Sequence, residues 1–214
     1  EFPELTDALL GLLYPHYLSP IPSCMVVKLD SASDLQNPDT IAPGREFDTE
    51  PVRGEALRYR TTAPVTLWPI EVENIRLTGL PIAAPANPAA AGAVAALRIT
   101  LKCMSDDMTF DKLGVETLRF YLPGPANQTL PLYELLCAHT MSIAFADNAV
   151  DPSPVIVPAA MLQPAGFTDE EALLPWTARG FAGFRFLTEY FAFPEKFLFV
   201  DIAGIDRKTM TAAG

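Results

Sequence analysis

The stretch from Gly166 to Asp206 reads GFTDEEALLPWTARGFAGFRFLTEYFAFPEKFLFVDIAGID and decides the fold more than any other part of the chain. After Gly183, apolar residues recur at helical spacing in two stripes, Phe184/Leu187/Phe191 and Phe186/Tyr190/Phe193. The two stripes leave a narrow polar strip of Arg185, Thr188 and Glu189, so the predicted helix is covered on most sides. Pro194 ends it, and Phe197 to Ile202 predicts a buried strand. We therefore expect one helix, corner and strand core that contains Phe184, Leu187, Phe191 and Phe197.

The residues just before this helix have the pattern of a capping box. Thr168 is followed three positions later by Glu171, so the hydroxyl and the carboxylate can satisfy each other's backbone N–H groups. The pattern predicts a short helix that Pro175 ends early. Arg185 and Glu189 stand four residues apart, which favours a surface ion pair between them. Lys196 offers Glu189 and Glu195 a further cation.

Elsewhere the pattern predicts many short strands and few helices. An amphipathic helix runs over Leu5 to Leu13, and a second helix over Leu130 to Ala138 has Pro131 in its first turn. Alternating or continuous apolar runs predict strands at Cys24–Leu29, Leu57–Thr62, Val65–Ile75, Val94–Cys103, Val115–Leu122, Met141–Phe145 and Val155–Val157. Such an order indicates an α+β fold, with a mostly antiparallel sheet or sandwich, a few short helices and the N-terminal amphipathic helix.

The domain organisation follows from these elements. We expect an N-terminal helix over residues 1–15, a β-rich α+β domain over 16–206 and a tail over 207–214. At 214 residues the chain is long enough for one substantial domain or two small ones.

Composition favours a protein that buries surface against partners. Half of the residues are hydrophobic, 19% are charged, and the mean hydropathy is +0.20. A net charge of −11 repels the phosphate backbone and anionic membrane surfaces, so we expect no nucleic acid partner. The most apolar run, Pro81 to Leu97, is broken by prolines and rich in alanine, so we expect no direct membrane insertion.

Residues that could carry chemistry are scattered. The three cysteines, Cys24, Cys103 and Cys137, read as buried free thiols of a reducing compartment. The two histidines, His16 and His139, form no metal-ligand spacing with them. The densest acidic group lacks the regular spacing of a calcium loop and reads as a solvated loop; it comprises Asp106, Asp107, Asp111 and Glu116. We therefore assign no catalytic, cofactor-binding or metal-binding residue and expect no cofactor and no enzyme.

Two alternatives stay open at this point. Trp68 and Trp176 each adjoin a proline, and such pairs can bind sugars, which would make this a carbohydrate-binding β-module. We interpret Trp68 as a core residue and leave Trp176 unassigned. Carboxylates distant in the sequence could also meet in a cleft, as an uncharacterised hydrolase requires.

Four ordered motifs resemble one family. They are Phe2–Pro22 (FPELTDALLGLLYPHYLSPIP), Arg60–Val72 (RTTAPVTLWPIEV), Leu118–Leu136 (LRFYLPGPANQTLPLYELL) and Phe184–Phe199 (FRFLTEYFAFPEKFLF). The motifs and their order along the chain resemble those of TssF, a baseplate subunit of the bacterial type VI secretion system. Together they extend over nearly the whole chain.

The resemblance implies a non-catalytic assembly protein. Proteins similar to TssF pair with TssG, TssK and a second TssF copy in baseplate wedges that support a contractile, phage tail-like sheath. It also implies a cytoplasmic location at a baseplate docked on the inner membrane. TssF proteins continue beyond both ends of this sequence, so we expect an internal fragment.

Overall fold

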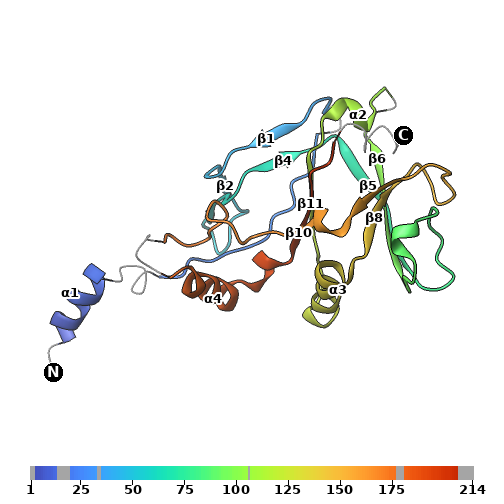
Figure 1. Cartoon of the computed structure of the whole chain (residues 1–214). Coiled ribbons are helices and arrows are strands. Elements are labelled where there is room, and N and C mark those ends of the chain that lie inside the picture. Colours follow the sequence, from blue (N-terminus) through green and yellow to red (C-terminus); the bar gives the residue numbers. More distant parts are fainter. Residues whose placement is uncertain (1–2, 14–19, 33–34, 106, 177–180, 207–214) are drawn as a thin grey trace. The chain divides into compact units, whose positions relative to one another are not determined.

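A computed structural model describes residues 3–13, 20–32, 35–105, 107–176 and 181–206 (Figure 1). The contacts within the chain divide it into two compact units. Unit 1 comprises Glu1–Lys28, Ala42–Pro64 and Ala165–Phe199, and unit 2 comprises Leu29–Ile41, Val65–Pro164 and Val200–Gly214. The division into a helix over 1–15, a domain over 16–206 and a tail stays a prediction, and residues 207–214 lie outside the described ones.

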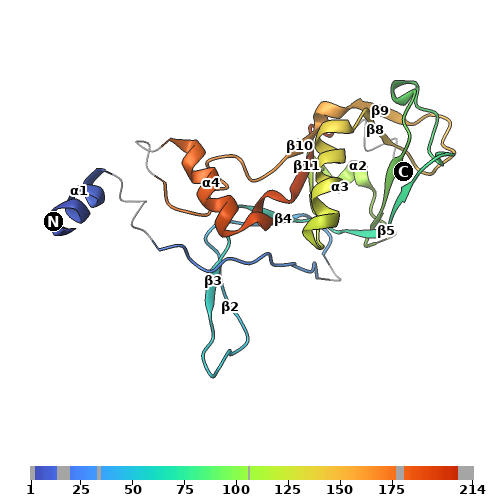
Figure 2. The same cartoon turned by 90° about the horizontal axis from the view of Figure 1, so that it is seen from below.

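Unit 1 contains two α-helices, a 3-10 helix and one hairpin among its described residues. The elements are α1 (Pro3–Leu13), β2 (Glu46–Asp48), β3 (Arg58–Arg60), α4 (Ala182–Ala192) and the 3-10 helix η4 (Pro194–Phe197). Figure 2 shows β2 and β3 as one hairpin. Phe47 pairs with Tyr59 across it, and their stacked rings have centres 6.1 Å apart. Arg58 holds the Asp48 carboxylate at 2.9 Å, and this hydrogen bond lowers the pKa of Asp48.

Unit 2 contains most of the strands. Its elements are β1 (Asp39–Ile41), β4 (Val65–Leu67), β5 (Ile70–Thr78), η2 (Pro88–Ala90), β6 (Ala96–Cys103), α2 (Phe110–Leu113), β7 (Thr117–Tyr121), α3 (Ala126–His139), β8 (Ser142–Phe145), β9 (Val155–Pro158), η3 (Ala159–Met161), β10 (Leu162–Pro164) and β11 (Phe199–Ala203). The order β10–β11–β7 forms a three-stranded sheet, while β1–β4, β5–β6 and β8–β9 form pairs. The β5–β6 ribbon is the longest pair and contains an irregularity between Val72 and Asn74.

The expected fold class is confirmed. Every strand pair with a defined register is antiparallel, and short helices accompany the strands. The strands are distributed over several small sheets because many of them are only three residues long.

Three local predictions are wrong. Residues 24–29 form no strand, because an apolar pattern alone supplies no neighbouring strand with which to pair. The residues after Thr168 form a turn, with Ala172 N donating to Asp169 O at 3.3 Å, instead of a capped helix. The helix expected over 130–138 also starts earlier, directly after Pro125, so that Pro131 lies inside α3.

The hydrophobic core of unit 2 forms where α2, β7 and the segment after β11 meet. Its buried residues are Leu113, Val115, Leu118 and Ile205. Partly buried side chains pack around them, including Ile70, Leu101, Cys103, Phe120, Phe145 and Ile202. Trp68 packs against the same cluster, which confirms its interpretation as a core residue.

Shortening a residue of this core should destabilise the protein, because a cavity replaces packed atoms. We expect Leu118→Ala to lower the free energy of unfolding by about 2–5 kcal/mol. The matched control, Leu77→Ala on the exposed face of β5, should change it by less than about 0.5 kcal/mol. Urea denaturation of the two variants measures both values, and equal losses would show that Leu118 does not belong to the core.

Candidate interaction surface

Helix α4 has its charged residues on the inner side and one of its two apolar stripes, Phe184, Leu187 and Phe191, on the outer side. The side chains of Glu189 and Arg185 are 0% and 2% exposed. Phe184 and Phe191, by contrast, are 64% and 81% exposed, and Leu187 between them is also exposed. An amphipathic surface helix normally has the opposite arrangement.

The predicted core is therefore wrong for three of its four residues. Phe184, Leu187 and Phe191 lie on the outer face, and only Phe197 is buried. Arg185 and Glu189, expected on a narrow polar strip, occupy the inner face. The reason is that the neighbouring loop offers backbone N–H groups and counter-ions, which periodicity along one helix does not report.

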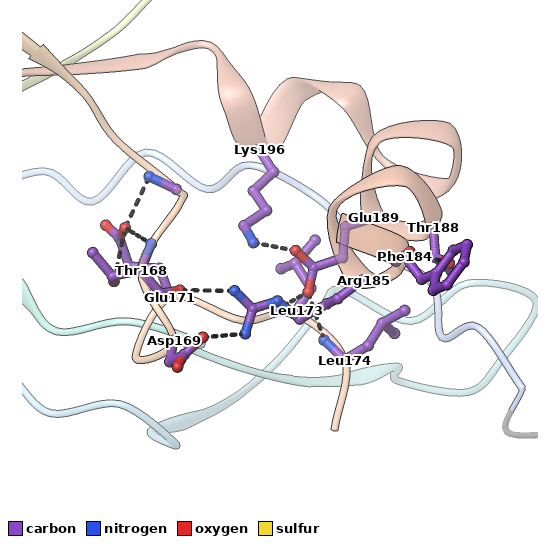
Figure 3. Close-up of polar contacts among 11 residues, drawn as sticks. Thr168, Asp169, Glu171, Leu173, Leu174, Phe184, Arg185, Thr188, Glu189 and Lys196 are labelled. Carbon is purple, nitrogen blue, oxygen red and sulfur yellow. Dashed lines mark hydrogen bonds and ion pairs between the residues drawn. The ribbon is translucent and has the colours of Figure 1, made fainter. Parts of the chain in front are cut away.

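Glu189 is held from three directions. Its Oε1 accepts hydrogen bonds from the backbone N–H groups of Leu173 at 2.9 Å and Leu174 at 3.2 Å. Its Oε2 pairs with Nζ of the buried Lys196 in η4 (Figure 3). A buried carboxylate is tolerated when it is paired and its lone pairs are satisfied. Glu189 thus fastens α4 to the loop before Pro175 and to the 3-10 helix after Pro194.

Arg185 extends this network toward the preceding turn. Its Nη1 donates to Asp169 Oδ1 at 2.7 Å and its Nη2 to Thr168 O at 3.4 Å. The guanidinium carbon lies 4.7 Å from the centre of the Phe186 ring. The expected pairing of Arg185 with Glu189 is wrong, because each binds a partner outside the helix. The pairing of Glu189 with Lys196 is confirmed.

Glu171 organises the turn itself. Its Oε2 accepts from the backbone N–H of Gly166 at 2.8 Å and from the Thr168 hydroxyl at 3.1 Å. Gly166 has φ +92°, and a Cβ there would lie 2.9 Å from Lys196 O. Only glycine fits this close approach. The Thr168–Glu171 motif therefore closes a tight loop rather than capping a helix. Together with the contacts of Glu189 and Arg185, it forms the inner polar network of α4.

Aromatic rings complete the inner side of α4. The ring of Phe167 lies 5.0 Å from that of Phe197 and 5.8 Å from that of Phe186, centre to centre. Tyr190 reaches the Phe197 ring at 6.0 Å. Figure 3 shows the Phe184 ring on the side of the helix away from Glu189 and Lys196.

An open pocket of about 630 Å³ lies beside the polar network within unit 1. Its lining includes Arg60, Asp169, Leu173, Trp176 and Arg185. Arg185 and Asp169 already bind each other there. Trp176, left unassigned by the sequence, thus lies at the pocket wall.

The cysteines offer no activated nucleophile. Burial raises the pKa of Cys24, with the nearby Glu189 carboxylate adding to the effect, and burial also raises the pKa of Cys103 and Cys137. All three thiols are free. Cys137 is exposed, so its expected burial is wrong. Among the described residues, no group of three His, Cys, Asp or Glu side chains could hold a metal ion. His16 and Asp106 lie outside the described residues.

Two further surfaces expose apolar side chains. On α1 these are Leu5, Leu9, Leu12 and Leu13, and on β5 they are Val72, Ile75 and Leu77. Both elements also carry charged residues, Glu4 and Asp7 on α1 and Glu71, Glu73 and Arg76 on β5. Across the described part of the chain, we find no helix with the length and apolar character needed to span a membrane.

Comparison with known proteins gives a consistent result. The family model described as type VI secretion system, TssF matches residues 1–214. Component TssF1 of Pseudomonas aeruginosa is 39% identical over 97% of this chain. A chain in a cryo-electron microscopy structure of a TssK–TssF–TssG baseplate subcomplex superposes with a TM-score of 0.77 at 29% identity over 95% of this chain.

These matches place the protein among the components of type VI secretion systems. The chain belongs to the TssF family. It spans about a third of the length of its relatives, 34% of the Pseudomonas aeruginosa protein and 37% of the chain in the subcomplex. The sequence motifs had indicated the same family.

The observed orientation of α4 predicts that a charged residue, and not Phe191, is the one whose loss destabilises the protein. We expect Glu189→Gln to destabilise the protein by about 3–5 kcal/mol, because it leaves the buried Lys196 without its counter-ion. Phe191→Ala, which the predicted core would have made severely destabilising, should change the free energy of unfolding by less than about 0.5 kcal/mol. Thermal unfolding of the two variants measures the difference. A larger loss for Phe191→Ala than for Glu189→Gln would contradict the inverted orientation of α4.

Proposed function

We propose that the protein is a structural subunit of a type VI secretion baseplate wedge that supports contractile tail assembly. The proposal extends to this chain the partners of its family: TssG, TssK and a second copy of TssF. Membership of the TssF family supports it, as does the likeness to a chain of the TssK–TssF–TssG subcomplex.

The single observation that carries the proposal is the outward-facing aromatic surface of α4. A helix that buries Arg185 and Glu189 and exposes Phe184 and Phe191 forgoes about 1.5–3 kcal/mol of burial for each large apolar side chain. Interface cores are enriched in aromatic residues and depleted in charge, which is the composition of this face. A neighbouring subunit would recover that burial.

A structural role also agrees with the chemistry of the described residues. Partial burial raises the pKa of the Cys24 and Cys103 thiols, and Arg185 and Glu189 of α4 are each bound to a charged partner. We propose that the subunit is non-catalytic and acts in the cytoplasm, at a baseplate docked on the inner membrane. The carbohydrate-binding alternative loses its main support because Trp68 packs in the core.

Co-purification tests this function. Expressed with the TssG and TssK proteins of its own system, the full-length protein should be recovered with both from a single tagged subunit. Recovery of each protein alone, although all three are folded and present in excess, would overturn the proposal.

Charge substitutions test whether the apolar surfaces carry the assembly. We expect glutamate at Leu5, Leu9 and Leu12 of α1, or at Val72, Ile75 and Leu77 of β5, to reduce recovery of at least one partner. The melting temperature should stay unchanged because these side chains are exposed. The matched control is Val150→Glu at a solitary exposed position. Full recovery with every surface charged, α4 included, would place the interfaces outside this chain.

A further inference from the structure

We propose that the outer face of α4 pairs in antiparallel fashion with α4 of a second copy of this chain, about a two-fold axis beside Leu187. The pairing assigns a particular surface to the second copy, and to that extent rests on the proposed function. The outer face of α4 comprises Phe181, Phe184, Leu187 and Phe191, and the half-exposed Tyr190 lies at its edge, where its ring also contacts Phe197 on the inner side.

The spacing of the stripe is nearly symmetric about the centre of the helix. Leu187 is the middle residue of α4, which runs from Ala182 to Ala192. Phe184 stands three positions before it and Phe191 four positions after it. A second helix running in the opposite direction therefore brings each Phe184 opposite the Phe191 of the other copy. A two-fold interface requires this self-complementarity, since the same patch serves on both subunits.

The two ends of the stripe also match in shape. At the N-terminal end, the rings of Phe181 and Phe184 meet edge to face with centres 5.8 Å apart. At the C-terminal end, Tyr190 and Phe191 meet in the same way at 5.7 Å. Antiparallel pairing places one edge-to-face pair against the other, an arrangement that aromatic rings favour.

Charge distinguishes α4 from the other uncovered surfaces. Two copies that each carry a net charge of −11 repel each other unless their contact is free of charge. The charged residues of α4, Arg185 and Glu189, are buried and bound on its inner side. The α1 helix presents Glu4 and Asp7, and would bring like charges together. Thr188, exposed on α4, donates its hydroxyl to Phe184 O at 2.8 Å, so pairing leaves this donor satisfied.

The area of the face suits a stable contact. Aromatic side chains supply about 150–250 Å² each, so the exposed fractions of Phe181, Phe184, Tyr190 and Phe191 (72%, 64%, 44% and 81%) together present roughly 400–650 Å², to which Leu187 adds. Standard interfaces bury about 800 Å² per partner, whereas apolar patches on soluble monomers usually cover only a few hundred Å². One copy of α4 therefore provides most of its side of a standard two-fold interface.

Site-directed disulfide formation tests the geometry in the full-length protein. Cys24, Cys103, Cys137 and any further cysteines are first replaced by serine, and the melting temperature is checked. A mixture of Phe184→Cys and Phe191→Cys chains carrying different tags should form a mixed disulfide dimer, several-fold more than either chain forms alone. Leu187→Cys should cross-link to itself. Val150→Cys, at a position that is 86% exposed in unit 2, is the matched control and should stay monomeric.

Parallel cross-linking, in which Phe184→Cys chains couple to themselves as readily as to Phe191→Cys chains, would overturn the antiparallel pairing. So would an absence of cross-links above the Val150→Cys background.

A second measurement separates this inference from the proposed function. We expect Leu187→Glu to weaken self-association in sedimentation by about tenfold or more, because it buries carboxylates without partners. Recovery of TssG should persist, and Val150→Glu should change neither. If Leu187→Glu abolishes TssG recovery and leaves self-association intact, α4 binds TssG and the pairing is wrong, while the baseplate function stands. If the unmodified protein itself fails to recover TssG, the proposed baseplate function is wrong.

Discussion

The ion pair between Glu189 and Lys196, with the two backbone N–H groups that share the carboxylate, sets the orientation of α4 and of everything fastened to it. The pair is buried, so each charge depends on the other. Replacing a buried pair with apolar residues is often neutral, so such a pair is weak evidence for stability as such. Its effect here is on rotation about the helix axis. With Glu189 facing Leu173 and Lys196, the stripe of Phe184 and Phe191 has to face outward.

The same constraint explains the loop before the helix. Glu171 and Arg185 bind backbone groups of the turn from Gly166 to Asp169, so the turn is organised by side chains and not by a sheet or helix ladder. Gly166 lets the turn approach the Lys196 carbonyl, which closes the loop onto the 3-10 helix. Contacts between residues 15 to 30 positions apart, from Leu174–Glu189 to Gly166–Lys196, thereby join the turn, α4 and the 3-10 helix into one network. Within unit 1, this polar network and the rings of Phe167, Phe186 and Phe197 hold the segments together. Within unit 2, an apolar core does so.

Sequence reasoning could find the elements and the family, but not the orientation of the decisive helix. Period-two runs predicted β3 and β6 well, because a half-buried strand has only two faces. In α4, apolar residues occur on both sides, so periodicity could not tell which stripe lies inside. The answer depended on Lys196 and on the N–H groups of Leu173 and Leu174, whose proximity is a tertiary fact. One signal was available: Arg185 and Glu189 share a narrow strip flanked by a proline-terminated loop and a lysine, as a buried ion network requires. The short strands β1, β2 and β10 were not predicted, since no longer alternating run marked them as the run over residues 57–62 marked β3.

The inverted helix also divides the residues of α4 between two kinds of evolutionary constraint. Changes at Arg185 and Glu189 have to be matched by changes within the same polypeptide, at Asp169 or Lys196. Changes at Phe184, Leu187 and Phe191 leave folding almost untouched and have to be matched in whatever surface lies against them. Across related systems, the inner positions should therefore covary with Asp169 and Lys196, whereas under the proposed pairing the outer positions of α4 should covary with one another. Under the proposed pairing, two related proteins with identical interiors can therefore fail to pair with each other when the outer faces of their α4 helices differ.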